Sequence, residues 1–169
     1  MNKVIYTIIV AAASVGLTLA GVFIYQKIQE EKEFTKYNNY LQKEYFPLLS
    51  DCADYFQKVA KANSDVELSE WTLEKQAGVK NIKLLTQLEE LKQEVINHDV
   101  SGEDSLLMKK YVLNSIEGAM RSTRIVNIYN MKDDNYETAE EFDGLFSKSL
   151  DYTTKQLNKR NDVMDKHGL

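Results

Sequence analysis

Apolar and polar residues follow two different patterns along this chain. Residues 4–25 contain no charged side chain, whereas from residue 27 onward apolar positions recur every three or four residues between polar ones. Spacings of three and four place apolar residues on one face of an α-helix, so the second pattern predicts amphipathic helices. The sequence therefore predicts a short tail (1–3), an apolar segment (4–25) and an amphipathic helical domain (26–169).

The apolar segment, VIYTIIVAAASVGLTLAGVFIY, runs for 22 residues from Val4 to Tyr25. At 1.5 Å per residue, a helix of this length crosses a bilayer core of about 30 Å. We therefore expect a transmembrane helix over residues 4–25, in contact with membrane lipid. The alternative is a secretory signal cleaved near Ala20. It is disfavoured because the apolar run exceeds the usual length of roughly 7 to 15 residues for such signals.

Lysines and small residues suggest how this segment is placed. Lys3 precedes it, but Lys27 and further lysines follow it, so the positive-inside rule is nearly balanced. A lysine before an apolar run is the commoner start of such proteins, so we expect the helical domain outside the cytoplasm. Ala12, Gly16 and Ala20 recur every four residues and form a smooth face on which a second copy of the helix can pack.

Four amphipathic helices are predicted in the domain. The clearest apolar stripe passes through Phe34, Tyr37, Leu41, Tyr45, Leu48, Cys52, Tyr55 and Val59. Pro47 lies inside this stripe, and we expect a kink or a short break there because proline lacks an amide hydrogen. Similar apolar stripes, separated by polar turn residues, predict the other three helices. The four expected helices cover residues 27–62 (with a break at 47), 69–98, 104–131 and 135–166.

The fold class that follows is all-α. Short connections between helices of similar length favour antiparallel neighbours, so we expect an up-down-up-down four-helix bundle. The single cysteine, Cys52, excludes an intrachain disulfide, so packing must hold the fold. This architecture resembles the helical-bundle sensor domains of bacterial chemoreceptors, although no motif is shared. Because the sequence contains no second apolar span, we expect any signal to pass through a partner.

Charge excludes some partners of the domain. Of the 21 basic residues only Lys3 precedes residue 27, and none of the 26 acidic residues does, so the domain carries a net charge of −6. Proteins that bind nucleic acid or anionic lipid surfaces usually present a basic patch. We therefore expect no nucleic acid as a partner.

The residue patterns of metal sites and enzymes are missing. Neither His98 nor His167 has a glutamate three residues before it, as di-iron helical bundles require. The sequence also has no cysteine pair and no glycine-rich phosphate loop. Acidic residues such as Glu94 stand among lysines and are more typical of a solvated helix face than of acid–base catalysis. We expect no catalytic residue, no metal and no cofactor.

Two pairs of residues are candidate contact sites. Arg121 and Arg124 lie one turn apart and can clamp a carboxylate or a phosphate, although Glu117 offers Arg121 a structural ion pair four residues away. Tyr40 is expected to be exposed beside Pro47, where a proline break would free backbone groups for a protein partner.

These patterns favour binding over catalysis. We expect a single-pass protein of the cell membrane whose bundle is a protein-interaction or assembly module, with an unidentified partner at Tyr40 and Pro47. A ligand-binding sensor subunit that signals through a partner is the alternative, and an enzyme of unrecognised type is the third class. An apolar pocket with converging polar groups inside the bundle would favour the sensor. A buried carboxylate of raised pKa in a cleft would favour the enzyme.

Overall fold

The computed structural model describes the backbone of residues 3–62, 75–129 and 136–169, and the side chains of residues 22–61, 80–127 and 140–169. Within these residues the chain is all-helical and contains no strand, which confirms the predicted fold class. The helices are α1 (Lys3–Ala62), α3 (Lys75–Asn97), α4 (Glu103–Tyr129) and α5 (Tyr136–Asp165). The predicted helix boundaries at residues 69, 131 and 135 lie outside the described residues.

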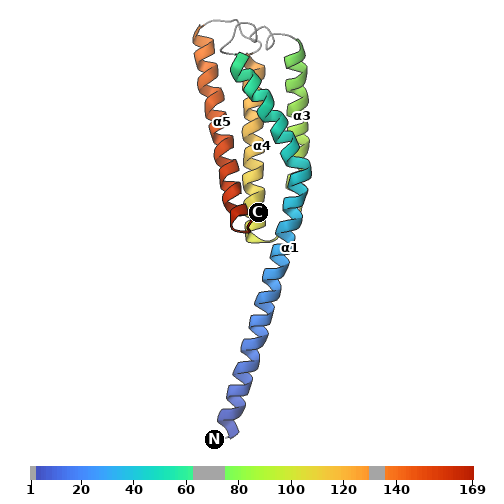
Figure 1. Ribbon diagram of the computed structural model, residues 1–169, viewed down its shortest axis with the longest axis vertical. Helices are drawn as coiled ribbons and strands as arrows, with labels where there is room; N and C mark the ends of the chain where they lie inside the picture. Colours follow the sequence, from blue (N-terminus) through green and yellow to red (C-terminus); the bar gives the residue numbers. More distant parts are fainter. Residues whose placement is uncertain (1–2, 63–74, 130–135) are drawn as a thin grey trace.

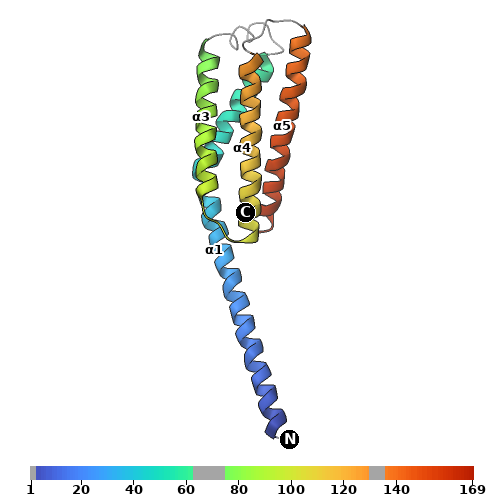
Figure 2. The ribbon, with the colours of Figure 1, turned by 180° about the vertical axis from the view of Figure 1, so that it is seen from behind.

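The helices form a bundle at the end of a single-helix stalk. Figures 1 and 2 show the first part of α1 extending alone and its second part running beside the other three helices. α3 runs back toward the stalk, α4 runs away from it and α5 returns, so the carboxyl terminus lies at the stalk end of the bundle (Figure 1).

α1 continues through Pro47 without interruption, over 60 residues. The helix therefore has no break at Pro47, whereas the kink expected as the alternative to a break stays a prediction. Proline removes one intrahelical hydrogen bond, but Tyr45 before it and Cys52 after it are both buried in the core. Burying a large apolar side chain contributes roughly 1.5–3 kcal/mol. The packed stripe therefore outweighs the local cost of proline.

The core consists of the apolar stripes of all four helices. The α1 stripe is buried as expected, apart from Leu48, which is half-buried. The largest fully buried side chains are Tyr37, Tyr45, Tyr55, Phe34, Leu41, Leu88, Met108, Ile116, Met120, Val95, Val112 and Val126. The core therefore begins at Phe34, where α1 joins the bundle.

The turn between α3 and α4 is tied to α1 by Glu33. Its carboxylate accepts hydrogen bonds from the Ser101 hydroxyl at 2.5 Å, from the Ser101 amide and from the Gly102 amide at 3.4 Å. These hydrogen bonds hold the pKa of Glu33 below its usual value. Because Gly102 precedes the first turn of α4, the negative charge also meets the positive end of that helix dipole.

The stalk carries exposed apolar side chains. Val22, Phe23, Ile24, Tyr25 and Ile28 are all exposed. Among the residues that the structure describes, no helix has the length and apolarity needed to cross a membrane. The side chains of residues 1–21, including the face formed by Ala12, Gly16 and Ala20, lie outside the described residues. The transmembrane helix at 4–25 and its packing face therefore stay predictions.

Candidate binding groove between α1 and α5

The bundle is closed along three of its edges and open along the fourth. Cα atoms of α4 come within 8 Å of those of α1, α3 and α5, and α1 comes equally close to α3. Among the described residues, no Cα pair within 8 Å joins α1 to α5. The first and last helices therefore stand apart across the surface of α4.

A groove with a volume of about 590 Å³ lies along this open edge. It is lined by Phe46, Leu49, Ser50, Cys52, Ala53, Phe56, Gln57 and Ala60 of α1, by Ala119 of α4, and by Leu150, Thr153, Thr154, Leu157, Arg160 and Asn161 of α5. Most of these side chains are apolar, and none is a carboxylate. Grooves of about 300 to 1,000 Å³ with mostly apolar walls are typical of small-molecule sites.

Two side-chain contacts bridge the groove between α1 and α5. Toward the end farther from the stalk, Phe56 of α1 meets Phe146 of α5 edge to face, with 5.7 Å between ring centroids. Toward the stalk, the Arg160 guanidinium lies 4.1 Å from the centroid of the Phe46 ring. Both geometries are favourable aromatic contacts. The space between them is therefore a feature of the packed bundle.

Arg160 is the one cation in the groove lining and is only 5% exposed. Its Nη1 donates a hydrogen bond to Asn161 Oδ1 at 2.9 Å, and its Nη2 contacts the sulfur of Met164. The buried Nε–H has no hydrogen-bond partner. No carboxylate of the described residues pairs with this guanidinium. Burial lowers the pKa of Arg160 because it disfavours the charged form.

The floor of the groove offers no activated nucleophile. Cys52 is buried, and burial raises the pKa of its thiol to about 12. The Tyr45 hydroxyl, in the core of the bundle, lies 2.5 Å from Ser115 Oγ, and burial raises its pKa to about 12. A thiolate is the reactive form of cysteine, so this raised pKa disfavours the reactive form of Cys52 at neutral pH.

The predicted contact residue Tyr40 is not freely exposed. It is half-buried, and its ring stacks on His98 with 4.3 Å between centroids and lies 6.1 Å from Tyr37. Its buried hydroxyl has no hydrogen-bond partner. The expectation of an exposed ring is corrected, because His98 at the end of α3 covers it. Pro47 is exposed, but it lies within an unbroken helix.

The structure turns Arg121 and Arg124 toward different helices. The guanidinium of Arg121 lies 5.7 Å from the Tyr152 ring of α5. Arg124 lies 3.7 Å from the Glu89 carboxylate of α3. The two arginines therefore do not converge on a common anion site. The ion pair expected between Arg121 and Glu117 is also replaced, because Glu117 contacts Lys92.

The two histidines both pack against aromatic rings of α1. His98 stacks on Tyr40, and His167 stacks on Phe34 with 3.8 Å between ring centroids. His167 Nε2 also lies 3.1 Å from Asp104 Oδ2. Within the described part of the chain, no three His, Cys, Asp or Glu side chains gather as metal ligands would.

Sequence analysis did not single out Arg160, the third arginine of the chain. A signal was present, because Arg160 follows Thr153 and Leu157 at spacings of four and three and thus belongs to the apolar stripe of its helix. A charged residue inside such a stripe is buried or lines a cavity. The open edge itself has no such signal, since it depends on how far apart two helices pack.

Comparison of the chain with protein-family models found no matching family. Neither the curated proteins nor the solved structures gave a match.

Proposed function

We propose that this chain is a membrane-anchored binding protein whose helical bundle takes a small apolar ligand into the groove between α1 and α5. The observation that carries the proposal is the groove itself, an open apolar space with one buried cation in its wall. Convergence of polar groups on an apolar pocket is the usual form of a ligand site. The ligand-binding alternative is thus favoured over a protein-interaction surface at Tyr40, whose ring is already covered by His98.

The anchor belongs to the same proposal. The uncharged run of residues 4–25 is long enough to cross a bilayer core of about 30 Å. The exposed side chains at its end agree with a lipid environment: Phe23 is 69% exposed, and its neighbours Ile24 and Tyr25 are exposed as well. Contiguous apolar surface of this kind usually contacts lipid or another protein. The bundle would then stand outside the cytoplasm, with the groove held away from the membrane by the stalk.

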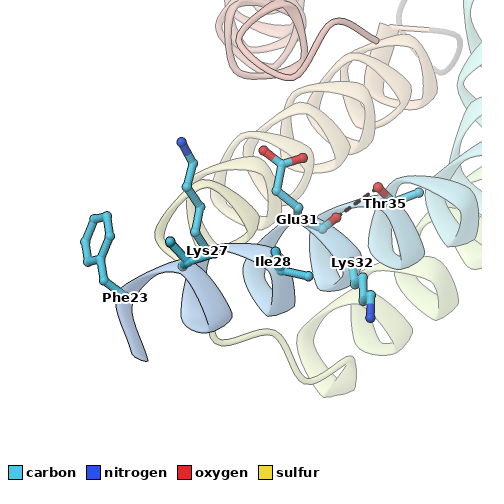
Figure 3. A pocket seen from close by; sticks show the side chains of 7 residues that line it. Phe23, Lys27, Ile28, Glu31, Lys32 and Thr35 are labelled. Atoms are coloured by element: carbon cyan, nitrogen blue, oxygen red, sulfur yellow. Dashed lines mark hydrogen bonds between the residues drawn. The ribbon is translucent and has the colours of Figure 1, made fainter. Parts of the chain in front are cut away.

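Assembly with another protein is a second candidate function, favoured by a separate observation on the stalk. A shallow depression lined by α1 alone extends from Phe23 past the proposed span to Thr35 (Figure 3). Ile28 within it is 47% exposed. Lys27 and Glu31 point to the same side of the helix, and Lys32 points away from them (Figure 3). A second copy of the stalk packed on this face would cover Ile28 and pair unlike charges.

Photolabelling of the full chain in lipid nanodiscs tests the ligand proposal. The probe is decan-1-ol carrying a terminal diazirine, which crosslinks to whatever surrounds it when illuminated. We expect labelled peptides from both groove walls, residues 46–60 and 150–161. Ala53→Trp, which fills the groove from an exposed position, should remove this labelling. Ser147→Trp, at an exposed α5 position outside the lining, is the matched control. Labelling confined to stalk peptides, or equal labelling in Ala53→Trp, refutes the proposal.

Mass spectrometry of membrane-extracted protein tests the anchor. We expect the intact chain, with residues 1–25 retained, because the apolar run is too long for an efficient signal. An amino terminus at Gly21 with the remainder in the soluble fraction would remove the anchor from the proposal and leave the groove unaffected.

A further inference from the structure

We propose that the groove is selective for amphipathic monocarboxylates, with Arg160 binding the carboxylate and the groove walls enclosing an unbranched apolar tail. This inference rests on the proposed function and names the class of ligand. A fatty acid is the simplest molecule with this chemistry.

The charge balance of the groove calls for one anion. A buried charge without a partner is costly, and proteins normally pair it with a counter-ion. Arg160 lacks such a partner among the described residues, and the lining contributes no carboxylate of its own. The face of the Phe46 ring supplies only part of the missing interaction. A ligand carboxylate would supply the remainder.

The hydrogen-bonding groups at this end are suited to a carboxylate. The guanidinium presents donors in a fixed fork that matches the two oxygens of a carboxylate, and its Nε–H is unused. Asn161 offers its oxygen to Arg160, which leaves its amide N–H groups as further donors at the groove. One lining cation matches one negative charge. A phosphate monoester, which carries nearly two charges, is less well matched.

The rest of the groove is suited to a tail. The α1 wall from Phe46 to Ala60 covers fifteen residues, and the fourteen steps between them span about 21 Å at 1.5 Å per step. Beyond Arg160 the opposite wall presents Leu157 and Leu150. The bridge between Phe56 and Phe146 lies toward the far end. A ligand with its charge near the stalk end and its tail directed away from the stalk would therefore place each part against matching chemistry.

A pair of photoprobes with the same tail tests the selectivity. The diazirine-bearing decan-1-ol is compared with the diazirine-bearing decanoate, both applied to the full chain in nanodiscs at neutral pH. We expect decanoate to label residues 46–60 and 150–161 with an affinity about tenfold higher than decanol, since a charge-assisted hydrogen bond is worth that much. Unlabelled decanoate should displace it, and decyl phosphate should compete less well.

Variants of Arg160 test whether this residue causes the preference for a carboxylate. Arg160→Gln should lower the affinity for decanoate about tenfold relative to decanol on the same variant, so that the preference for the carboxylate disappears, whereas Arg160→Lys should keep part of the preference. Circular dichroism checks that each variant is folded. Should Arg160→Gln fail to fold, the comparison of the two probes on the unchanged chain still decides the matter.

The outcomes separate the two proposals. Equal labelling of the groove by both probes, or decanoate labelling that Arg160→Gln leaves intact, overturns the carboxylate site but leaves the groove as a ligand site. Stronger competition by decyl phosphate than by decanoate also overturns it. Absence of groove labelling by both probes would remove the ligand-binding function itself.

Discussion

α5 packs against two neighbours in opposite ways. Against α4 it is close: Ser149 Oγ donates to the carbonyl of Gly118 at 3.1 Å, and the Ser122 and Ser149 hydroxyl oxygens lie 2.9 Å apart. A Cβ atom added to Gly118 would lie 2.2 Å from Thr153 Oγ1. Against α1 the same helix presents Leu150, Leu157 and Arg160 and stays apart.

The difference shows how side-chain size sets the spacing of helices in this bundle. Small residues let two backbones approach, and hydroxyl groups that are fully hydrogen-bonded can be buried at such a contact. Larger side chains keep α1 and α5 apart without filling the space between them. A bundle that is tight along one seam and open along another can keep its fold while it admits a ligand.

Gly118→Ala gives a large expected loss of stability for the addition of a single methyl group. The added methyl group overlaps Thr153, so we expect the free energy of unfolding to fall by about 1–3 kcal/mol. The measurement is thermal unfolding of the full chain, followed by circular dichroism. Gly144→Ala is the matched control: it lies in α5 with nothing within 4 Å of the new Cβ, and should raise stability by about 0.5–1 kcal/mol.

A double variant tests whether the overlap with Thr153 causes the loss of stability in Gly118→Ala. Thr153→Ala removes the hydroxyl that the new methyl group meets, so Gly118→Ala should cost less in that background than in the natural chain. Equal costs in both backgrounds would show that α4 and α5 are not in close contact at Gly118.

Arg160→Met should make the empty bundle more stable. Methionine fills a similar volume without a buried charge, and replacing buried charges by apolar residues often stabilises a protein by about 1–4 kcal/mol. We expect the lower end of that range, because contacts with Phe46 and Asn161 are lost. Denaturant unfolding without ligand measures it. A destabilised variant would mean that Arg160 is there to hold α1 to α5.

The sequence predicted which α1 residues lie in the core, but it did not predict the local structure at Pro47 or the burial of Tyr40. The α1 stripe from Phe34 to Val59 is buried because its spacing alone fixes a helix face. The expectations of a helix break at Pro47 and of an exposed Tyr40 ring were wrong for the same reason. Both expectations considered α1 alone, whereas packing across Pro47 and the ring of His98 at the end of α3 decide these positions.

The candidate groove could not be predicted from the sequence for a related reason. Arg121 and Arg124 are neighbours in sequence, yet Arg121 turns to α5 and Arg124 to α3. Arg160 becomes notable only when the opposite wall is seen to hold no acid. Helix periodicity tells which residues face inward, but the gap between two inward faces depends on the side chains of both helices together.

Glu33 makes a smaller, pH-dependent contribution to the free energy of unfolding, because its hydrogen bonds connect α1 to the turn before α4. Its folded-state pKa lies below the usual value of 4.5, so its contribution is present above that pH and is lost as pH falls through the folded pKa. We expect Glu33→Gln to lower stability at pH 7 by less than about 1 kcal/mol, given partial solvent screening. The variant should also lose less stability than the natural chain below pH 4.5. Unfolding midpoints measured across pH test both expectations. If the midpoints of Glu33→Gln and of the natural chain changed in parallel with pH, the hydrogen bonds of Glu33 would not contribute to stability.

Ala53→Leu carries the smallest expected change and tests the open side of the comparison directly. Ala53 is exposed and lines the groove, so a larger side chain has free space to enter, and we expect stability within about 0.5 kcal/mol of the natural chain. The counterpart is Ser122→Leu in the tight seam, where the same enlargement has no room and also removes the hydrogen bond to Ser149. Thermal unfolding of the two variants gives the contrast. If Ala53→Leu were as damaging as Ser122→Leu, the edge between α1 and α5 would be packed rather than open. The groove would then have no space for a ligand.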